Sequence, residues 1–149
     1  MYSRQPILSI IPVNYNNNKG LMKTLESVKK QTFPLYEHII IDANSTDGSK
    51  ETILKYEKEN PHLTFWSSEP DKGIYDGMNK GIKKAKGEYL YFLNSGDNLT
   101  EDVLLKISFD NTKYIYGNIR FTGGRKNREE KAPCKADLIF FLTKSLFHT

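Results

Sequence analysis

Apolar residues along the chain fall alternately into short continuous runs and into stretches with helical spacing. Four runs rich in aliphatic and aromatic residues predict strands, at 7–13, 38–42, 63–68 and 88–94. Three intervening stretches carry apolar residues every three or four positions and predict helices, at 19–32, 47–59 and 74–86. Beyond them, the pattern predicts a short helix at 101–109 and a fifth strand at 113–121, with a bend at Gly117.

Strands that alternate with helices predict an α/β fold, an open and mostly parallel sheet with helices on both faces. The runs 7–13 and 38–42 are almost wholly apolar, which is typical of strands buried on both faces. The run 63–68 alternates apolar and polar residues, as expected nearer a sheet edge. Gly87 follows the third helix, where a left-handed cap is expected.

Polar residues follow three of these strands at the point where each strand ends. Asn14, Tyr15 and Asn16 follow the first strand, Asp42 closes the second, and 94–97 close the fourth. Ligands of open parallel sheets bind outside the carboxyl ends of the strands, where the strand order reverses. Each polar cluster alone would be an ordinary turn. If the first strand lies centrally, the three clusters converge, and a binding site is then the better interpretation.

The composition is that of one globular domain. The chain has 149 residues, 38% of them hydrophobic and 27% charged. The single cysteine excludes an internal disulfide framework and favours a cytoplasmic location. No stretch approaches the ~20 apolar residues of a membrane span.

The net charge of +4 is modest and local, which argues against a general nucleic-acid-binding protein. The segment from Arg120 to Lys135 holds six basic and two acidic residues and therefore carries the whole excess. An anion-facing loop and a merely solvated loop both explain it.

The polar clusters favour a site that holds a nucleotide through a metal ion over a site built on one of the common phosphate-binding loops. The first loop, "VNYNNNKG", lacks the glycine pattern of dinucleotide sites, and the chain has no P-loop motif. Mg²⁺ needs only one or two carboxylates when substrate phosphates complete its coordination. Asp97 fits that role, with Gly96 allowing close approach of the phosphates. Asp42 can accept a hydrogen bond from a base, and Tyr15 can stack on one.

Four blocks, "SIIPVNYNN", "IIIDANSTDGS", "SEPDKGIYDGMNKGI" and "YLYFLNSGD", together resemble the family 2 glycosyltransferases. Their order and spacing match across residues 8 to 97, and the third block is the most diagnostic. The resemblance implies a GT-A-like (Rossmann-like) fold. The variant blocks look like bacterial enzymes of surface-polysaccharide assembly.

The resemblance implies a role for each matching residue. Pro12, Asn14 and Tyr15 would line the nucleoside pocket, and Asp42 would contact the base, with Ser45 in the same loop. Asp71 would flank the base or ribose. Asp76 opens the third helix at the crevice, although an exposed ion pair with Lys80 also explains it. The family's Asp-x-Asp motif falls on Ser95, Gly96 and Asp97, which leaves Asp97 as its sole carboxylate and the ligand of Mn²⁺ or Mg²⁺.

The resemblance also implies an inverting reaction, which needs a base to deprotonate the acceptor. Only 52 residues follow Asp97. Glu129, Glu130 and Asp137 lie there without a supporting motif, and His148 resembles part of an acceptor-side element. We therefore assign no catalytic base. We expect residues 1–122 to be the nucleotide-sugar-binding part and 123–149 a basic loop with the start of an incomplete acceptor-side region, as in a truncated chain or a natural short form.

Three hypotheses remain open at this point. The first is a glycosyltransferase that moves a sugar from a nucleotide-sugar donor, a UDP-sugar in our interpretation, to a saccharide or polyprenyl-linked acceptor. The second is a non-catalytic nucleotide-sugar-binding module. The third is a structural fragment whose apolar tail packs on a partner. The basic loop and this tail suggest peripheral association with the inner face of the cytoplasmic membrane and a homodimer through the tail.

Overall fold

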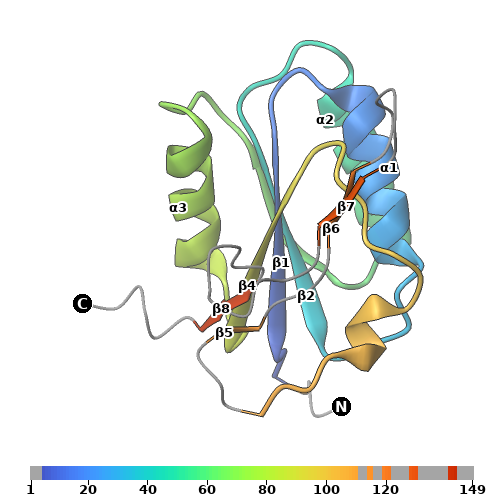
Figure 1. Ribbon diagram of the computed structural model, residues 1–149. Coiled ribbons are helices and arrows are strands. Elements are labelled where there is room, and N and C mark those ends of the chain that lie inside the picture. Colours follow the sequence, from blue (N-terminus) through green and yellow to red (C-terminus); the bar gives the residue numbers. More distant parts are fainter. Residues whose placement is uncertain (1–4, 111–113, 116–118, 122–127, 131–140, 144–149) are drawn as a thin grey trace.

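The computed structural model describes residues 5–110, 114–115, 119–121, 128–130 and 141–143. A six-stranded sheet has the order β3-β2-β1-β4-β8-β5 (Figure 1). Its four parallel strands are β1 (Leu8–Asn14), β2 (Tyr36–Asp42), β3 (Leu63–Ser68) and β4 (Tyr89–Asn94). The antiparallel strands are β5 (Tyr114–Ile115) and β8 (Phe141–Thr143), and a separate pair consists of β6 (Ile119–Phe121) and β7 (Arg128–Glu130).

Helices cover both faces of the parallel strands. Helices α1 (Asn18–Lys29) and α2 (Ser49–Glu59) lie on one face, and α3 (Ile74–Lys84) lies on the other (Figure 1). The faces alternate along β1: Ile10 packs in the cluster that contains Val28 of α1, whereas Ile11 packs with Ile82 of α3. Within the described part of the chain, no helix is both long and apolar enough to cross a membrane.

The predicted α/β fold with a mostly parallel sheet is confirmed. β1 lies between β2 and β4, so the strand order reverses at β1. β3 lies at an edge of the sheet, as its alternation predicts. The predicted strands and helices up to residue 94 are all present, with boundaries that differ by up to three residues.

Three local predictions are wrong. The helix predicted at 101–109 is a single 3₁₀ turn, Val103–Lys106. The strand predicted at 113–121 is divided, because β5 pairs with β8 in the main sheet and β6 pairs with β7 in the other. Gly87 has no left-handed backbone. It is needed for space instead, since a Cβ atom there would lie 2.6 Å from the backbone nitrogen of Ser9.

Buried polar groups close the end of the sheet where the parallel strands begin. Glu37 is buried and accepts hydrogen bonds from the hydroxyls of Ser9 (2.6 Å) and Thr64 (2.9 Å). His38 is fully buried, and its Nδ1 lies 3.0 Å from the hydroxyl of Tyr56. Burial lowers the pKa of His38 to about 3, so this imidazole is neutral at neutral pH.

Candidate functional site

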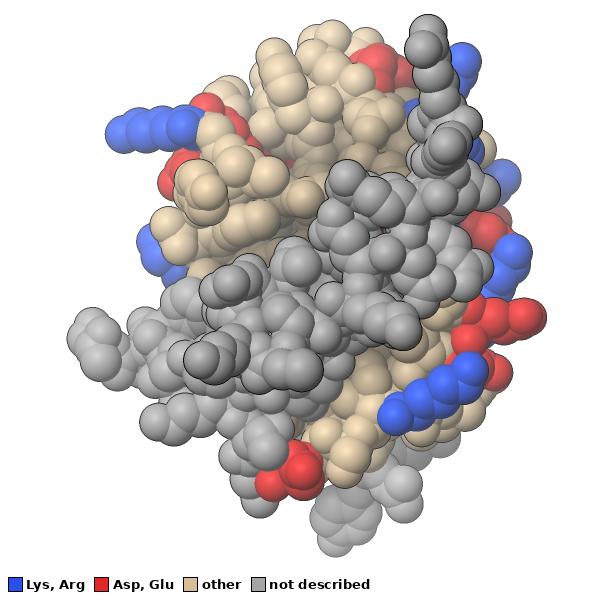
Figure 2. Space-filling view, in the orientation of Figure 1, with Lys and Arg blue, Asp and Glu red and all other residues tan. Residues whose placement is uncertain are grey.

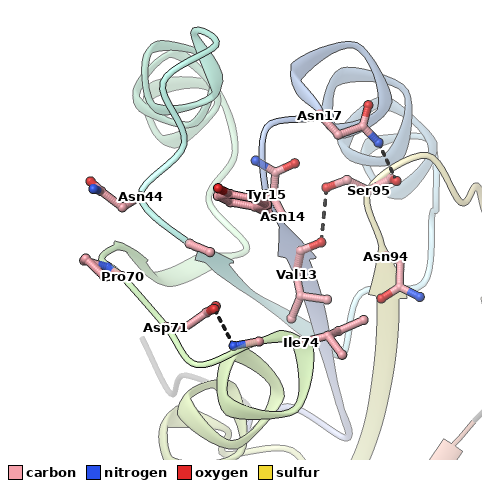
Figure 3. Close-up of a pocket in the computed structure, with 12 residues that line it drawn as sticks. Val13, Asn14, Tyr15, Asn17, Asn44, Pro70, Asp71, Ile74, Asn94 and Ser95 are labelled. Atoms are coloured by element: carbon pink, nitrogen blue, oxygen red, sulfur yellow. Dashed lines mark hydrogen bonds between the residues drawn. The ribbon is translucent and has the colours of Figure 1, made fainter.

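A pocket of about 680 Å³ opens at the carboxyl ends of β1, β2 and β4, where the strand order reverses (Figure 3). This is the position at which open α/β sheets bind ligands. The residues that line it come from three strand ends and from the start of α3: Val13, Asn14, Tyr15, Asn17, Ala43, Asn44, Pro70, Asp71, Gly73, Ile74, Asn94 and Ser95. The polar clusters at the ends of the first, second and fourth strands therefore converge, as the sequence predicts.

The strand register places three polar side chains in one row beneath the pocket. Asn14 is the register partner of Asp42, which in turn is the partner of Ser68. Asn14 Nδ2 donates to Asp42 Oδ1 (2.6 Å), and Ser68 Oγ donates to Asp42 Oδ2 (2.6 Å). Parallel pairing thus creates the network, although these residues are 26 or more positions apart in the chain.

Ser45 completes the coordination of the Asp42 carboxylate. Its hydroxyl donates to Oδ1 (2.6 Å) and its backbone N–H donates to Oδ2 (2.9 Å). Each carboxylate oxygen of Asp42 then accepts two hydrogen bonds, which fills the capacity of an ionised carboxylate. Asp42 is also fully buried. A direct hydrogen bond from a base to the Asp42 carboxylate, as the sequence predicts, would require one of these four donors to leave.

Ser45 also joins the loop after β1 to the loop after β2. Its hydroxyl accepts from the backbone N–H of Asn16 (2.8 Å) and from Nδ2 of Asn14 (3.2 Å). Asp47 continues this link: it accepts from the backbone N–H of Asn18 (2.7 Å) and from the hydroxyl of Ser49 (2.6 Å). The bond from Ser49, followed by that from Asn18, holds the pKa of Asp47 below its usual value. Asp47 therefore serves the starts of two helices, α1 and α2.

The rim of the pocket presents two exposed side chains from different loops. Tyr15 follows β1 and is 68% exposed, so one face of its ring is open to a planar ligand. Asn44 follows β2 in the left-handed region, with φ 56°, a conformation that asparagine tolerates better than most residues. In Figure 3, Tyr15 lies between Asn44 on one side and Ser95 on the other. A flat polar ring of a ligand fits this arrangement.

The start of α3 forms the opposite wall. Asp71 accepts from the backbone N–H of Gly73 (2.9 Å). Gly77 leaves room for the Asp71 carboxylate beside α3, because a Cβ atom there would lie 3.2 Å from Asp71 Oδ2. Further along, a Cβ atom on Gly81 would lie 2.4 Å from Ile11 Cγ2, so α3 packs on β1 through its own backbone.

Asp76 does not line the pocket. Its carboxylate lies 3.9 Å from Lys80 and accepts from the backbone N–H of Lys72 (3.1 Å). Lys80 also donates to the backbone oxygen of Pro70 (2.8 Å). These contacts favour the structural interpretation of Asp76, which braces the loop before α3.

The turn after β4 brings Asn94 and Ser95 to the pocket, whereas Asp97, two positions further along, is exposed and does not line it. Gly96 has φ 107°, a backbone conformation that favours glycine. Ser95 donates through both its N–H and its hydroxyl to the backbone oxygen of Val13 (3.1 and 3.2 Å). Among the described residues, no hydrogen bond or ion pair to the Asp97 carboxylate is present, so it can take an external ligand.

The charges around the site are few. In Figure 2, uncharged residues cover the upper central part of the visible surface, and Lys, Arg, Asp and Glu lie mostly towards its margins. Burial, and then the charge of Asp97, raise the pKa of Tyr91 to about 12, so this phenol is neutral at neutral pH. Across the part of the chain that the structure describes, no three His, Cys, Asp or Glu residues form a group that could hold a metal ion. A cation here would therefore depend on Asp97 together with oxygen atoms of a ligand.

The structure brings together most of the sequence-predicted site residues. Asn14, Tyr15, Asp71 and Ser95 line the pocket, while Asp42 and Ser45 lie directly behind it. Pro12, Gly96 and Asp97 are neighbours of lining residues. Asn17, Asn44, Gly73 and Ile74 also line the pocket but escape sequence reasoning, because they look like ordinary turn and helix-start residues.

Several predictions lie outside the described residues. Asp137, His148 and most of the basic segment 120–135 and of the apolar tail fall there. Glu129 and Glu130 lie in β7, and the structure describes only their backbone. The assignment of a catalytic base and the homodimer through the tail therefore stay predictions.

Comparison with known proteins gives consistent matches. Residues 9–147 match the family described as "Glycosyl transferase family 2". The chain is 41% identical over 93 residues to a glycosyltransferase of Mycobacterium tuberculosis H37Rv, Rv1514c, and covers 34% of its length. It is 34% identical over 106 residues to TuaG of Bacillus subtilis, named as a teichuronic acid biosynthesis glycosyltransferase, with 71% of this chain and 42% of TuaG covered. The chain thus spans about a third to two fifths of the length of these relatives.

A solved structure agrees in fold. S. aureus TarS 1–349 in complex with UDP-GlcNAc is 29% identical, with a TM-score of 0.57, and the match covers 66% of this chain and 29% of that one. The GT-A type of fold that the sequence predicts is thereby confirmed.

Proposed function

We propose that this chain, which belongs to glycosyl transferase family 2, binds a nucleotide-sugar donor. The donor would lie in the pocket at the carboxyl ends of β1, β2 and β4. In this proposal it is the donor-binding part of an inverting, metal-dependent glycosyltransferase of surface-polysaccharide synthesis. The family relationship and the teichuronic acid assignment of TuaG support this direction. The complex of TarS with UDP-GlcNAc supports a UDP-sugar as the donor.

The observation that carries the proposal is the pocket itself. Its volume of about 680 Å³ suits a nucleotide, and its walls combine an exposed aromatic ring with amide and carboxylate groups. We propose that Tyr15 stacks on the base and that Asp71 flanks the base or ribose. Asn14, held by Asp42 and Ser45, forms the floor under the nucleoside, together with the backbone next to Pro12. Asp42 then shapes the floor through its four donors.

The diphosphate is proposed to lie near the turn after β4. Asp97 offers one exposed carboxylate, and Ser95 and Gly96 offer a tight backbone turn beside it. Mn²⁺ or Mg²⁺ fits this donor set, because substrate phosphates and water supply the ligands that the protein does not. When bound, the cation neutralises the charge that develops on the departing nucleoside diphosphate.

The transfer step requires an acceptor hydroxyl to attack the anomeric carbon as the bond to the diphosphate breaks. Attack from the opposite side inverts the anomeric configuration, and the hydroxyl proton passes to a base that we leave unassigned. We propose a saccharide or polyprenyl-linked acceptor and a division of the chain at about residue 122 between donor and acceptor regions. A cytoplasmic location at the inner face of the membrane is part of the same proposal.

Calorimetric titration with UDP-, GDP- and dTDP-sugars, with Mn²⁺ or with EDTA, tests this function. UDP-sugars with Mn²⁺ should bind most tightly and should raise the melting temperature by mass action. Tyr15→Ala should weaken binding in both conditions. Tyr75→Ala is the matched control, because Tyr75 is 78% exposed but does not line the pocket.

Absence of binding by every nucleotide, or equal effects of the two tyrosine variants, would contradict the proposal. If a UDP-sugar binds, its turnover with an acceptor or with water would distinguish a transferase from a binding module.

A further inference from the structure

Helix α1 and its flanking residues carry a polar line beside the apolar face, and two of its four members, Thr24 and Gln31, are buried. The apolar residues Leu21, Leu25 and Val28 pack in the core. A separate line of polar side chains, Asn17, Thr24, Ser27 and Gln31, runs from just before the helix to just after it. We call this line the α1 polar strip. Residues seven positions apart lie on nearly the same side of a helix, so three of the four members share one side.

The α1 polar strip binds the backbone of the segment that follows β4, residues 95–104, which runs beside α1 in Figure 1. Near its far end, Ser27 accepts from the N–H of Leu99 (3.1 Å), and Gln31 donates to the oxygen of Thr100 (2.9 Å). Gln31 also accepts from the N–H of Leu104 (3.2 Å). The strip thus replaces the strand partner that this part of the segment lacks.

At the pocket end, the strip holds the backbone of the turn that presents Asp97. Asn17 Nδ2 donates to the oxygen of Ser95 (2.8 Å). The hydroxyl of Thr24 accepts from the N–H of Gly96 (2.9 Å) and donates to the oxygen of Asp97 (2.7 Å). The buried Thr24 hydroxyl therefore pairs with one backbone donor and one backbone acceptor of the turn at Gly96, whose φ is 107°.

The consequence is a fixed main chain with a free carboxylate. The backbone groups of Gly96 and Asp97 are bound by Thr24, while Asp97 is exposed two positions after Ser95, which lines the pocket. A carboxylate on a turn that is already ordered loses less conformational entropy when it takes a ligand.

We propose that Thr24 is a positioning residue for the cation-binding turn: its hydroxyl orders the backbone of Gly96 and Asp97 so that the Asp97 carboxylate is preorganised for a divalent cation shared with the nucleotide diphosphate. This inference rests on the proposed function and extends it to a residue outside the pocket. Residues behind a metal ligand commonly change metal affinity by about 10- to 100-fold when replaced.

Three variants separate this role from general support of the fold. Thr24→Val keeps the shape of the side chain but removes the hydroxyl, and with it the hydrogen bonds to Gly96 and Asp97 and a longer one to the oxygen of Asn94 (3.4 Å). Thr24→Ser keeps the hydroxyl. Ser27→Ala is the matched control, since it removes a member of the same strip that binds Leu99 rather than the turn. If Thr24→Val does not fold, Thr24→Ala takes its place.

Two measurements on each variant decide the matter. The first is the dissociation constant of UDP with Mn²⁺ and with EDTA, and the second is the hydrogen-exchange rate of the Gly96 and Leu99 amides. Thr24→Val should weaken UDP binding about 10- to 100-fold with Mn²⁺ only and speed exchange at Gly96. Thr24→Ser should have the parent's UDP affinity and the parent's exchange rate at Gly96. Ser27→Ala should speed exchange at Leu99 without changing UDP binding.

Faster exchange at Gly96 with unchanged Mn²⁺-dependent binding would overturn the positioning role of Thr24. Equal weakening with Mn²⁺ and with EDTA would also overturn it, because Thr24 would then support the pocket as a whole. A parent protein that binds UDP equally with Mn²⁺ and with EDTA would instead refute the cation in the proposed function, and Thr24's role with it. A parent that binds no nucleotide at all would refute the function before any variant is made.

Discussion

Replacement of Asp42 by asparagine should lower the free energy of unfolding by about 3–5 kcal/mol. The carboxylate accepts four hydrogen bonds, from Asn14, from Ser68 and twice from Ser45. In asparagine one oxygen becomes an NH₂ group, which cannot accept from the backbone N–H of Ser45. That loss costs about 1.5–3 kcal/mol, and bonds to the remaining neutral oxygen are about half as strong as those to a carboxylate.

Urea unfolding followed through Trp66, the only tryptophan, measures this loss. Trp66 lies in β3 and packs against the cluster that contains Ile53, so its fluorescence reports unfolding next to the network. Ser68→Ala is the matched control: it removes one donor and leaves three on the carboxylate, so it should cost about 1.5–3 kcal/mol. If Asp42→Asn is no more destabilising than Ser68→Ala, the fourfold coordination of Asp42 is wrong.

The same variant tests how Asp42 acts on a nucleotide. Methylation of the uracil N3 atom should weaken UDP binding by the same factor in the parent protein and in folded Asp42→Asn, because the carboxylate has no vacant acceptor position. If the methyl group loses its effect in Asp42→Asn, then Asp42 contacts the base directly, as the sequence predicts.

Three further predictions concern separate parts of the molecule. Asp97→Ala should abolish the effect of Mn²⁺ on UDP binding without lowering the melting temperature, and calorimetry with Mn²⁺ that matches the parent would exclude Asp97 as the metal ligand. Gly81→Ala should lower the free energy of unfolding by about 1–3 kcal/mol because its Cβ would overlap Ile11, whereas Asn79→Ala, exposed on the same helix, should be neutral or stabilising; equal results would refute the close packing of α3. The folded-state pKa of His38 is about 3, below its unfolded value of ~6.5, so the neutral imidazole contributes its full stabilisation above pH ~6.5. The free energy of unfolding should then fall by about 1.4 kcal/mol per pH unit as the pH drops from ~6.5 towards 3. Urea titrations at pH 6.5 and 5 should show that slope in the parent but not in His38→Gln, and an equal slope in both would assign the effect to other groups.

The sequence is sufficient for the parallel sheet because each parallel strand is a short apolar run between helical stretches. It is also sufficient for the place of the site, since a central first strand forces the polar ends of three strands to one edge. The register of the strands, however, cannot be predicted from the sequence. Ser68 looks like the polar end of an edge strand, and only its pairing with Asp42 makes it part of the floor of the pocket.

Two other features depend on tertiary packing in the same way. Thr24 and Gln31 look like ordinary polar positions on a helix, yet both are buried against the segment after β4. The seven-residue spacing of Asn17, Thr24 and Gln31, beside a separate apolar face, is the signal that could have identified them. Beyond residue 110 the periodicity is short and weak, which explains why one predicted strand is divided between two sheets.

The contact between α3 and β1 has a consequence for how the pocket can be altered. Because a Cβ atom at Gly81 would lie 2.4 Å from Ile11 Cγ2, α3 meets β1 with backbone at this position, and no rotamer change of residue 81 can absorb a displacement of the helix there. This contact lies away from the exposed start of the helix, where Ile74 lines the pocket. Substitutions of Ile74 would therefore reshape the mouth of the pocket while the contact at Gly81 is kept. Libraries aimed at altered ligand selectivity can therefore be confined to the turn before α3 and to Ile74, with Gly81 held constant.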